Sequence, residues 1–294
     1  MLATVKTMKD HNTDYTLNIG GKLLSLGSPM VMGILNCTPD SFFEGSRKQT
    51  EEEIAARANE IIEEGGGIID VGAFSTRPGA AQVSEEEEMS RLRFALEIVR
   101  RQQADAVLSI DTFRHDVAKM AVEEFGAGII NDVSGGNPEG SFGGESSADY
   151  ATDDDADCAP VLDEGWHGDV AYVLMSSQGP LEETMKFFAH RVRQLRRRGQ
   201  RDIILDPGFG FGKTMEQNFD TLYRMELLQE FGLPVLAGLS RKTMIWRTLG
   251  ITPAEALNGT SVLNTVALMK GASILRVHDV KEAVEAVKLV TPNF

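Results

Sequence analysis

Eight short apolar runs recur along the chain, and most are separated by longer stretches with apolar residues at helical spacing. The runs are continuously apolar rather than alternating, which is typical of strands covered on both faces. The amphipathic stretches between them predict helices that pack on those faces. The runs span residues 31–36, 68–73, 106–111, 128–132, 171–175, 202–208, 234–240 and 273–278.

Turn and cap signals punctuate this pattern. A hairpin with Gly20 and Gly21 at its turn is predicted before the first run. Helix starts are predicted at Thr50 and Ser84, each followed three residues later by Glu, and at Thr252, which precedes a proline. Glycines follow the helical stretches and mark where they end.

The alternation of eight strands with helices predicts a (β/α)8 barrel of the α/β class, forming one domain over residues 1–294. A doubly wound open sheet is the alternative. The fourth unit is the weak one, because its helix should fall within residues 137–169, which carry few helix signals. That segment holds ten acidic residues and no Lys or Arg, so it is predicted to be an irregular acidic loop or insertion at the surface.

The overall charge of the chain disfavours two classes of function. The chain has 294 residues, with 29 Lys and Arg against 44 Asp and Glu, which gives a formal charge of −15. A binder of nucleic acid or of anionic lipid is disfavoured, because both need concentrated positive charge. No apolar run approaches the ~20 residues that span a bilayer, and the N-terminus lacks the apolar stretch of a signal peptide. With only Cys37 and Cys158, a cytoplasmic protein with reduced thiols is expected.

Polar residues follow the ends of the predicted strands, where the active site of such a barrel lies. Asp111, Asn131 and Asp206 end three strands, and Lys242 follows a fourth. Two carboxylates, an amide and an amine form a set of donors and acceptors. Such a set suits a flat heterocycle with ring N–H, amino and carbonyl groups. The alternative for each residue is a structural one, in which it caps a neighbouring loop.

A second group, Asn36, Arg276 and His278, indicates an anion site. Arg offers a planar fork of donors, and His can donate or carry charge. The last predicted helix begins just after Asp279, so its N-terminus adds positive potential. Phosphate binding by the late loops is frequent in this fold. The alternative for His278 is a core histidine with no ligand.

The loops after the first and second strands are long and polar, and are expected to close over the reaction. Thr76, Arg77 and Pro78 lie in the second loop, where the alternative is a solvated Pro-Gly turn. The stretch GFGFGK lacks the spacing of a phosphate loop. Its glycines are expected to let the backbone and Phe211 approach a ligand closely.

The chain resembles the dihydropteroate synthase family in seven motifs, which run in family order and are highly specific together. They are MGILNCTPDSF (32–42), STRPGA (75–80), SIDTFR (109–114), IINDVSGG (129–136), DPGFGFGKT (206–214), GLSRKTMI (238–245) and GTSVLNTVALMKGASILRVHDV (259–280).

The resemblance implies a step of folate biosynthesis, in which 6-hydroxymethyl-7,8-dihydropterin diphosphate and 4-aminobenzoate give 7,8-dihydropteroate and diphosphate. It implies a pterin pocket of Asp111, Asn131, Asp206 and Lys242. It implies a diphosphate and Mg2+ region of Asn36, Arg276 and His278, with Asn36 nearest the metal. It implies an aminobenzoate site of Thr76, Arg77, Pro78, Phe211, Lys242 and Thr243. The catalytic set implied is Asn36, Asp111, Asp206, Lys242, Arg276 and His278.

Family members are commonly homodimers, and sulfonamides compete for their aminobenzoate site. This chain departs from the family at residues 175–179, where MSSQG replaces a pattern with a His near the pterin. It departs also at residues 73–79 and at Thr243, where Ser is common. The alternatives are a methyltetrahydrofolate:corrinoid methyltransferase, which has a related barrel, and a catalytically inactive pterin-binding homologue.

Overall fold

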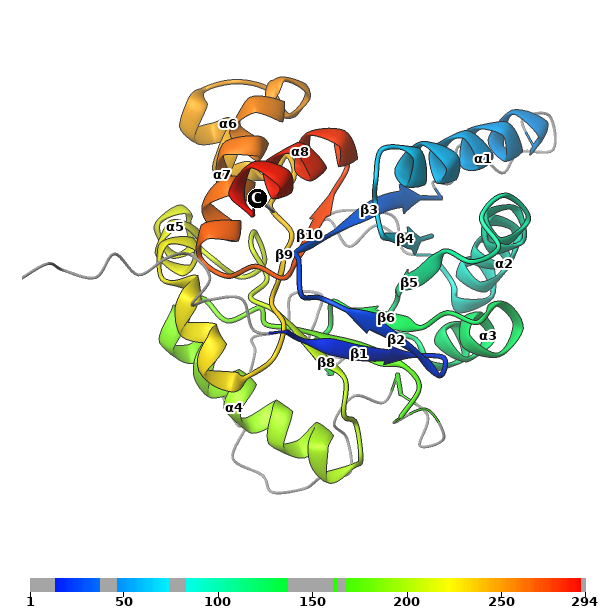
Figure 1. Ribbon diagram of the computed structural model, residues 1–294, viewed down its shortest axis with the longest axis horizontal. Helices are drawn as coiled ribbons and strands as arrows, with labels where there is room; N and C mark the ends of the chain where they lie inside the picture. The colour runs from blue at the N-terminus through cyan, green and yellow to red at the C-terminus, as the bar shows by residue number, and fades with distance from the viewer. Residues whose placement is uncertain are drawn as a thin grey trace, which may run out of the picture.

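The computed structural model describes residues 14–37, 47–73, 83–136, 161–162, 166 and 168–291. Its main sheet has eight parallel strands in the order β8-β7-β6-β5-β4-β3-β10-β9. A parallel bridge between Leu205 and Val235 joins the two edges of this sheet, so the strands form a nearly closed barrel (Figure 1). The barrel strands are β3 (Met30–Asn36), β4 (Ile68–Gly72), β5 (Val107–Asp111), β6 (Ile129–Asp132), β7 (Ala171–Met175), β8 (Ile203–Asp206), β9 (Leu236–Ala237) and β10 (Ile274–Val277).

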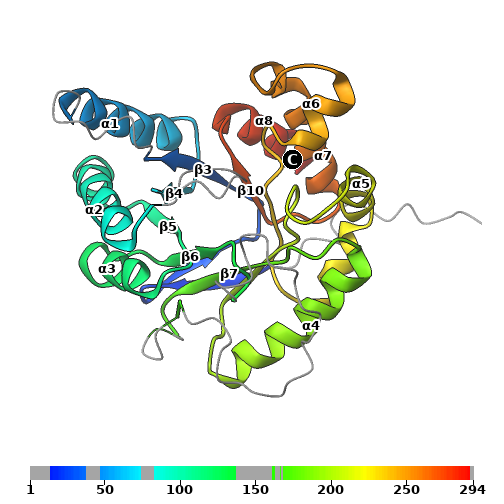
Figure 2. The ribbon, with the colours of Figure 1, turned by 180° about the vertical axis from the view of Figure 1, so that it is seen from behind.

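Helices lie around the strands (Figures 1 and 2), which confirms the predicted (β/α)8 barrel. None of the helices in the described ranges combines the length and apolar character needed to cross a membrane. The helices are α1 (Arg47–Glu63), α2 (Glu85–Gln102), α3 (His115–Phe125), α4 (Leu181–Arg197), α5 (Met215–Tyr223), α6 (Thr243–Leu249), α7 (Leu257–Met269) and α8 (Val280–Val290), with 3-10 turns η6 (Met225–Phe231) and η7 (Pro253–Glu255).

Two of the three predicted helix starts are confirmed. Ser84 Oγ accepts a hydrogen bond from the Glu87 amide at 3.2 Å and caps α2. Thr252 forms a capping box at the start of η7, although this element is only one turn long. The predicted start at Thr50 is wrong, because α1 begins at Arg47 and Thr50 lies buried inside it. The residues from Arg47 to Gln49 are good helix formers, so the helix extends one turn further back.

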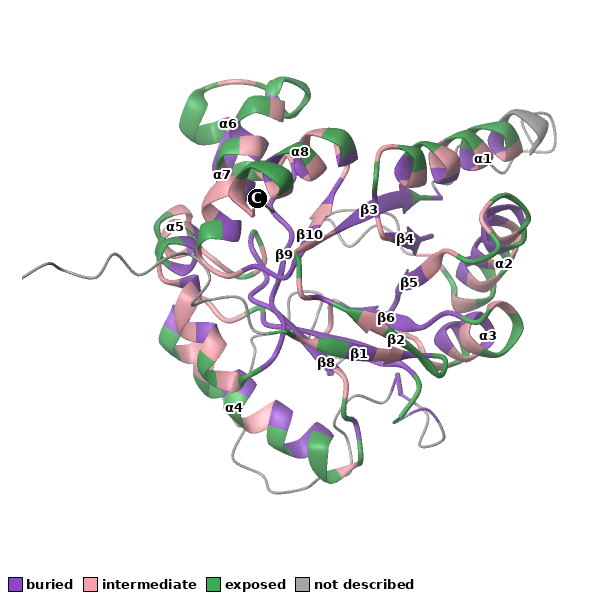
Figure 3. Ribbon diagram, viewed as in Figure 1, coloured by how far each residue is buried: buried purple, intermediate pink, exposed green. Residues whose placement is uncertain are grey.

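Alternate residues of the strands fill the inside of the barrel, and the others pack against the helices, so the strands are buried on both faces (Figure 3). The inner cluster is closed at one end by the hairpin β1 (Thr16–Ile19) and β2 (Lys22–Ser25). Leu17 and Ile19 of the hairpin are buried there, and the Gly20 amide donates to the Asp169 carbonyl at 2.7 Å. The predicted hairpin is therefore present and seals the end of the barrel opposite the strand carboxyl ends.

The fourth unit lacks a helix in the residues that the structure describes between β6 and β7. Three residues of the acidic segment are nevertheless buried: Val161, Leu162 and Trp166. The Trp166 ring stacks on His115 at the start of α3, with 6.0 Å between ring centroids. The expectation that all of residues 137–169 form a surface excursion is wrong for these three. They are large and apolar, so burial in the core is their lower free-energy state. Residues 137–160, 163–165 and 167 lie outside the described ranges.

Candidate active site

Polar side chains of five strands meet inside the barrel, next to the strand carboxyl ends. Successive side chains of a strand point to opposite faces, so a residue two positions after an inner one also points inward. The inner residues Ile68, Ile129, Ile204 and Ile274 are each followed in this way by a polar residue, and Val107 by two. These polar residues are Asp70, Ser109, Asp111, Asn131, Asp206 and Arg276. They form a polar layer above the apolar inner cluster.

Arg276 lies at the centre of this layer. Its Nε is 2.6 Å from Asp70 Oδ2, and its Nη2 is 2.6 Å from Asp111 Oδ2. Burial alone would lower the pKa of Arg276, but the two carboxylates raise it above its ordinary value. The sequence placed Arg276 at the anion site, whereas the structure commits two of its donors to the carboxylates of the polar layer.

Burial raises the pKa of Asp111 to about 7, against the opposing pull of Arg276. A carboxyl group with this pKa is present in both its protonated and its ionised form near neutral pH. It can therefore act as donor or acceptor toward a ring N–H or carbonyl of a heterocycle. This fits the role predicted for Asp111 in the heterocycle pocket.

Asp206 and Lys242 interact electrostatically. Burial raises the pKa of Asp206, and the Lys242 charge opposes that rise. Burial likewise lowers the pKa of Lys242 to about 8, and Asp206 opposes that fall. One oxygen of Asp206 accepts from the Gly208 amide at 2.7 Å, and the Lys242 ammonium donates to the Phe209 carbonyl. Both groups are thus oriented by the glycine-rich loop after β8.

His278 and Asn36 lie at the rim of the barrel. His278 Nδ1 is 3.0 Å from the Ser240 hydroxyl, which also accepts from the His278 amide at 3.2 Å. Burial lowers the pKa of His278 to about 4, and Arg276 acts in the same direction. His278 is therefore neutral at pH 7, and a Ser240 hydroxyl that donates to Nδ1 leaves Nε2–H as its free donor. Asn36 ends β3 and is exposed.

The structure describes two of the residues predicted for the aminobenzoate site besides Lys242, and three lie outside the described ranges. Phe211 lies with its ring 4.4 Å from the Lys242 ammonium. Thr243 is the first residue of α6 and is exposed. Thr76, Arg77 and Pro78 fall within residues 74–82, outside the described ranges, so their predicted roles stay predictions.

Asp70 does not stand at a strand end, so it is not among the site residues predicted from the sequence. It is completely buried in the middle of β4. Its carboxylate accepts from the Ser109 hydroxyl at 2.6 Å and from Asn131 Nδ2 at 3.3 Å, besides Arg276. The available signal was an acid inside a continuous apolar run, because such a group is buried only when it is paired.

Three basic residues near the strand carboxyl ends, which were not among the predicted site residues, hold neighbouring segments together. Arg241 has a left-handed backbone with φ of 52°, and its guanidinium makes a two-point ion pair with Asp279 at 2.8 and 2.9 Å. Arg57 of α1 donates to the carbonyls of Ile34 and His278, and so ties β3 to the residue after β10. Lys213 donates to the Ser176 carbonyl at 3.2 Å, and burial lowers its pKa to about 8.

Known proteins are similar to this chain in sequence and in architecture. The sequence profile of the family described as pterin binding enzyme matches residues 32–278. The dihydropteroate synthase of Escherichia coli K12 is 37% identical over 274 residues, which cover 92% of this chain and 93% of the relative. The match to the motifs in family order is therefore part of a similarity over nearly the whole chain.

Solved structures agree with this similarity. Xanthomonas albilineans dihydropteroate synthase with 4-aminobenzoic acid has a TM-score of 0.77 and 36% identity, over 94% of this chain and 97% of that one. Yersinia pestis DHPS with a pterine-sulfa conjugate has a TM-score of 0.74 and 30% identity, over 94% and 97% of the two chains. The chain thus belongs to the pterin-binding enzyme family and, within it, to the dihydropteroate synthases.

Proposed function

We propose that the protein condenses 6-hydroxymethyl-7,8-dihydropterin diphosphate with 4-aminobenzoate to give 7,8-dihydropteroate and diphosphate. The observation that carries this proposal is the polar layer. Four of its residues, together with Lys242, are the ones expected to contact the substrate: Asp111, Asn131, Asp206 and Arg276. These groups offer donors and acceptors next to the strand carboxyl ends, as a pterin ring requires. Relatives with 4-aminobenzoic acid and with a pterine-sulfa conjugate support both substrate classes.

The reaction breaks one C–O bond and forms one C–N bond. Diphosphate leaves with the C–O electron pair, and positive charge develops on the methylene carbon conjugated to the pterin ring. The amine nitrogen of 4-aminobenzoate then bonds to that carbon and releases a proton to water. Asp206 and Asp111 would hold the ring and stabilise this charge, while Phe211 and Lys242 would place the aminobenzoate. His278, as a neutral Nε2–H donor, would contact the leaving diphosphate.

We further propose that Mg2+ is bound with the diphosphate. No group of three or more His, Cys, Asp or Glu that could hold a metal occurs among the described residues. Mg2+ often needs no such group, because it takes oxygen ligands from one or two side chains, substrate phosphates and water. The exposed Asn36 side chain, whose carboxamide oxygen is a ligand of this kind, fits that pattern. When bound, the ion would neutralise charge on the leaving group.

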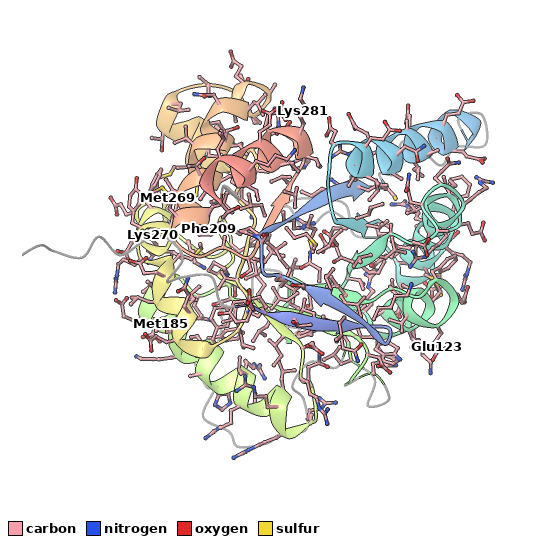
Figure 4. The ribbon with its side chains drawn as sticks, in the orientation of Figure 1. Glu123, Met185, Phe209, Met269, Lys270 and Lys281 are labelled. Atoms are coloured by element: carbon pink, nitrogen blue, oxygen red, sulfur yellow. The ribbon has the colours of Figure 1, made fainter. Side chains whose placement is uncertain are left out.

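We also propose a cytoplasmic homodimer. Large apolar side chains are exposed on three neighbouring helices: Leu249 of α6, Val262 and Met269 of α7, and Leu289 of α8. Met269 projects from the outside of the molecule, away from the barrel axis (Figure 4). Exposed apolar residues on neighbouring helices favour contact with another copy. Light scattering should give twice the chain mass, and a single chain mass would contradict the dimer.

The experiment that tests the activity follows diphosphate release with both substrates. Release should require 4-aminobenzoate and Mg2+, and a sulfonamide should compete with 4-aminobenzoate. Methyl transfer from methyltetrahydrofolate to a corrinoid, without diphosphate release, would identify the methyltransferase instead. A folded protein that binds the pterin but releases no diphosphate would be the inactive homologue.

A further inference from the structure

Asp70 lies deep in the barrel and receives hydrogen bonds from three other strands. Ser109 of β5, Asn131 of β6 and Arg276 of β10 all donate to its carboxylate, at 2.6, 3.3 and 2.6 Å. Strands β4 and β10 are not neighbours, since β3 lies between them. Asp70 therefore connects side chains from opposite parts of the polar layer.

The buried ion pair between Asp70 and Arg276 contributes little net stability to the fold. Burying a carboxylate and a guanidinium removes both from water, and well-packed apolar residues of similar size would stabilise a core as well or better. Asp70 stands two residues after Ile68, which belongs to the apolar inner cluster, so an apolar side chain would fit the pattern of the strand. Its presence therefore points to a role other than filling the barrel.

The bonds to Asp70 fix the direction of two pocket side chains. The Arg276 guanidinium is held at Nε by Asp70 and at Nη2 by Asp111, which sets its plane. Its third nitrogen, Nη1, has no hydrogen-bond partner among the described residues. Asn131 must turn its NH2 group toward Asp70, because an ionised carboxylate only accepts. The amide oxygen of Asn131 is thereby directed away from Asp70.

We infer that Asp70 is a positioning residue for the substrate pocket. It acts through Arg276 and Asn131, holding Arg276 Nη1 and the Asn131 amide oxygen in the direction in which the pterin receives them. Asp70 itself does not reach the ligand. The identity of the ligand rests on the proposed function, but the positioning of Arg276 is measurable without it.

The Asp70→Asn variant tests this inference. Three donors converge on the carboxylate, and an amide offers one oxygen while turning an NH2 group toward another donor. The direct readout is the NMR signal of the Arg276 Nε–H group, identified by its loss in Arg276→Lys. In the parent protein this proton should exchange slowly with water. In Asp70→Asn it should shift and exchange at least tenfold faster, and binding of the free hydroxymethylpterin should weaken roughly 5- to 50-fold.

Asp132→Asn is the matched control. Asp132 is also fully buried, but it lies on the outer face of β6 and bonds to the Tyr172 hydroxyl at 2.6 Å. Its substitution should leave the Arg276 Nε–H signal in place and should change pterin binding much less. If the parent protein released no diphosphate, the proposed function would be overturned. The Arg276 Nε–H signal and the binding of hydroxymethylpterin would still test the role of Asp70.

A double-mutant cycle keeps the inference testable if Asp70→Asn folds poorly. Asp70→Asn combined with Arg276→Gln removes both charges of this pair, and Asp111 loses its cation equally in Arg276→Gln alone and in the double variant. If Asp70 acts mainly through Arg276, the pair should lose no more than about threefold in pterin affinity beyond Arg276→Gln alone. Additive losses, or an unchanged Arg276 Nε–H signal in Asp70→Asn, would overturn the inference.

Discussion

The ammonium nitrogen of Lys242 lies 4.4 Å from the centroid of the Phe211 ring and donates a hydrogen bond to the Phe209 carbonyl. The loop after β8 and the turn before α6 thus hold each other. Gly210, between the two phenylalanines, has φ of 81°, and a Cβ there would come within 3.1 Å of the Lys242 chain. The glycine is required by this close approach, as well as by its backbone conformation.

The contact between Phe211 and Lys242 predicts the effect of Phe211→Leu. A cation over an aromatic ring contributes about 0.5–2 kcal/mol. Its loss should raise the KM for 4-aminobenzoate roughly 2- to 30-fold and should leave pterin binding nearly unchanged. Steady-state kinetics measures both. Phe219→Leu is the control, because Phe219 stacks on Tyr223 within α5 instead. Equal effects of the two substitutions would place Phe211 outside the aminobenzoate site.

Arg276→Ala should weaken binding of both pterin diphosphate and the free hydroxymethylpterin. The anion site inferred for Arg276 from the sequence predicts a far larger loss for pterin diphosphate than for the free hydroxymethylpterin. The structure predicts a broader loss, because the buried carboxylates of Asp70 and Asp111 would lose their cation. Breaking such a pair costs about 3–5 kcal/mol. Calorimetry with both ligands and a urea titration measure the two effects. Weakened binding of the diphosphate only, at unchanged stability, would contradict this account.

Trp166→Ala should destabilise the fold without changing the KM of either substrate. The side chain is buried, stacks on His115 and belongs to the same core as residues of α3 and α4. Replacing a buried Trp by Ala costs about 3–5 kcal/mol. Trp246→Ala on α6 is the control and should cost less, because Trp246 is only partly buried. A stability loss below that of Trp246→Ala would show that the acidic segment contributes nothing to the core.

His278 makes the free energy of unfolding depend on pH. Its folded pKa of about 4 lies below the ordinary value of 6.5, so between these values the unfolded chain binds more protons. Stability from His278 therefore rises with pH across this window and is lost as the solution becomes acidic. Asp111 acts in the opposite direction, because its pKa is raised to about 7 and its folded form holds the extra proton.

The His278→Asn variant isolates the contribution of His278, since Asp111 is present in both proteins. Lowering the pH from 8 to 5.5 should remove stability that His278 gives the parent and that the variant lacks. The unfolding free energy of the variant minus that of the parent should therefore be about 1 kcal/mol higher at pH 5.5 than at pH 8. Chemical denaturation at the two pH values measures the difference. A constant difference between the two proteins would show that His278 titrates normally in the folded state.

The sequence by itself determined the order of the elements and the face that carries the chemistry. Short continuous apolar runs bounded by turn signals are typical of strands covered on both faces, so the runs at 68–73 and 171–175 predicted inner barrel strands. Because all barrel strands are parallel, residues at their ends, such as Asp206 and Asn36, had to gather at one end of the barrel. Local signals were sufficient there, as they were for the caps at Ser84 and Thr252.

Only the tertiary structure decided which of these residues contact one another. Asp70 lies 206 positions before Arg276, and no local pattern relates them. The strand order of the sheet places β4 and β10 on either side of β3, and the Arg276 side chain reaches the buried carboxylates of both Asp70 and Asp111. Burial then moves the pKa of Asp111 and of Lys242 toward neutrality. Composition alone also marked Trp166 as part of a solvated segment, whereas the core made by distant helices buries it. These contacts depend on closure of the barrel, which a one-dimensional pattern does not record.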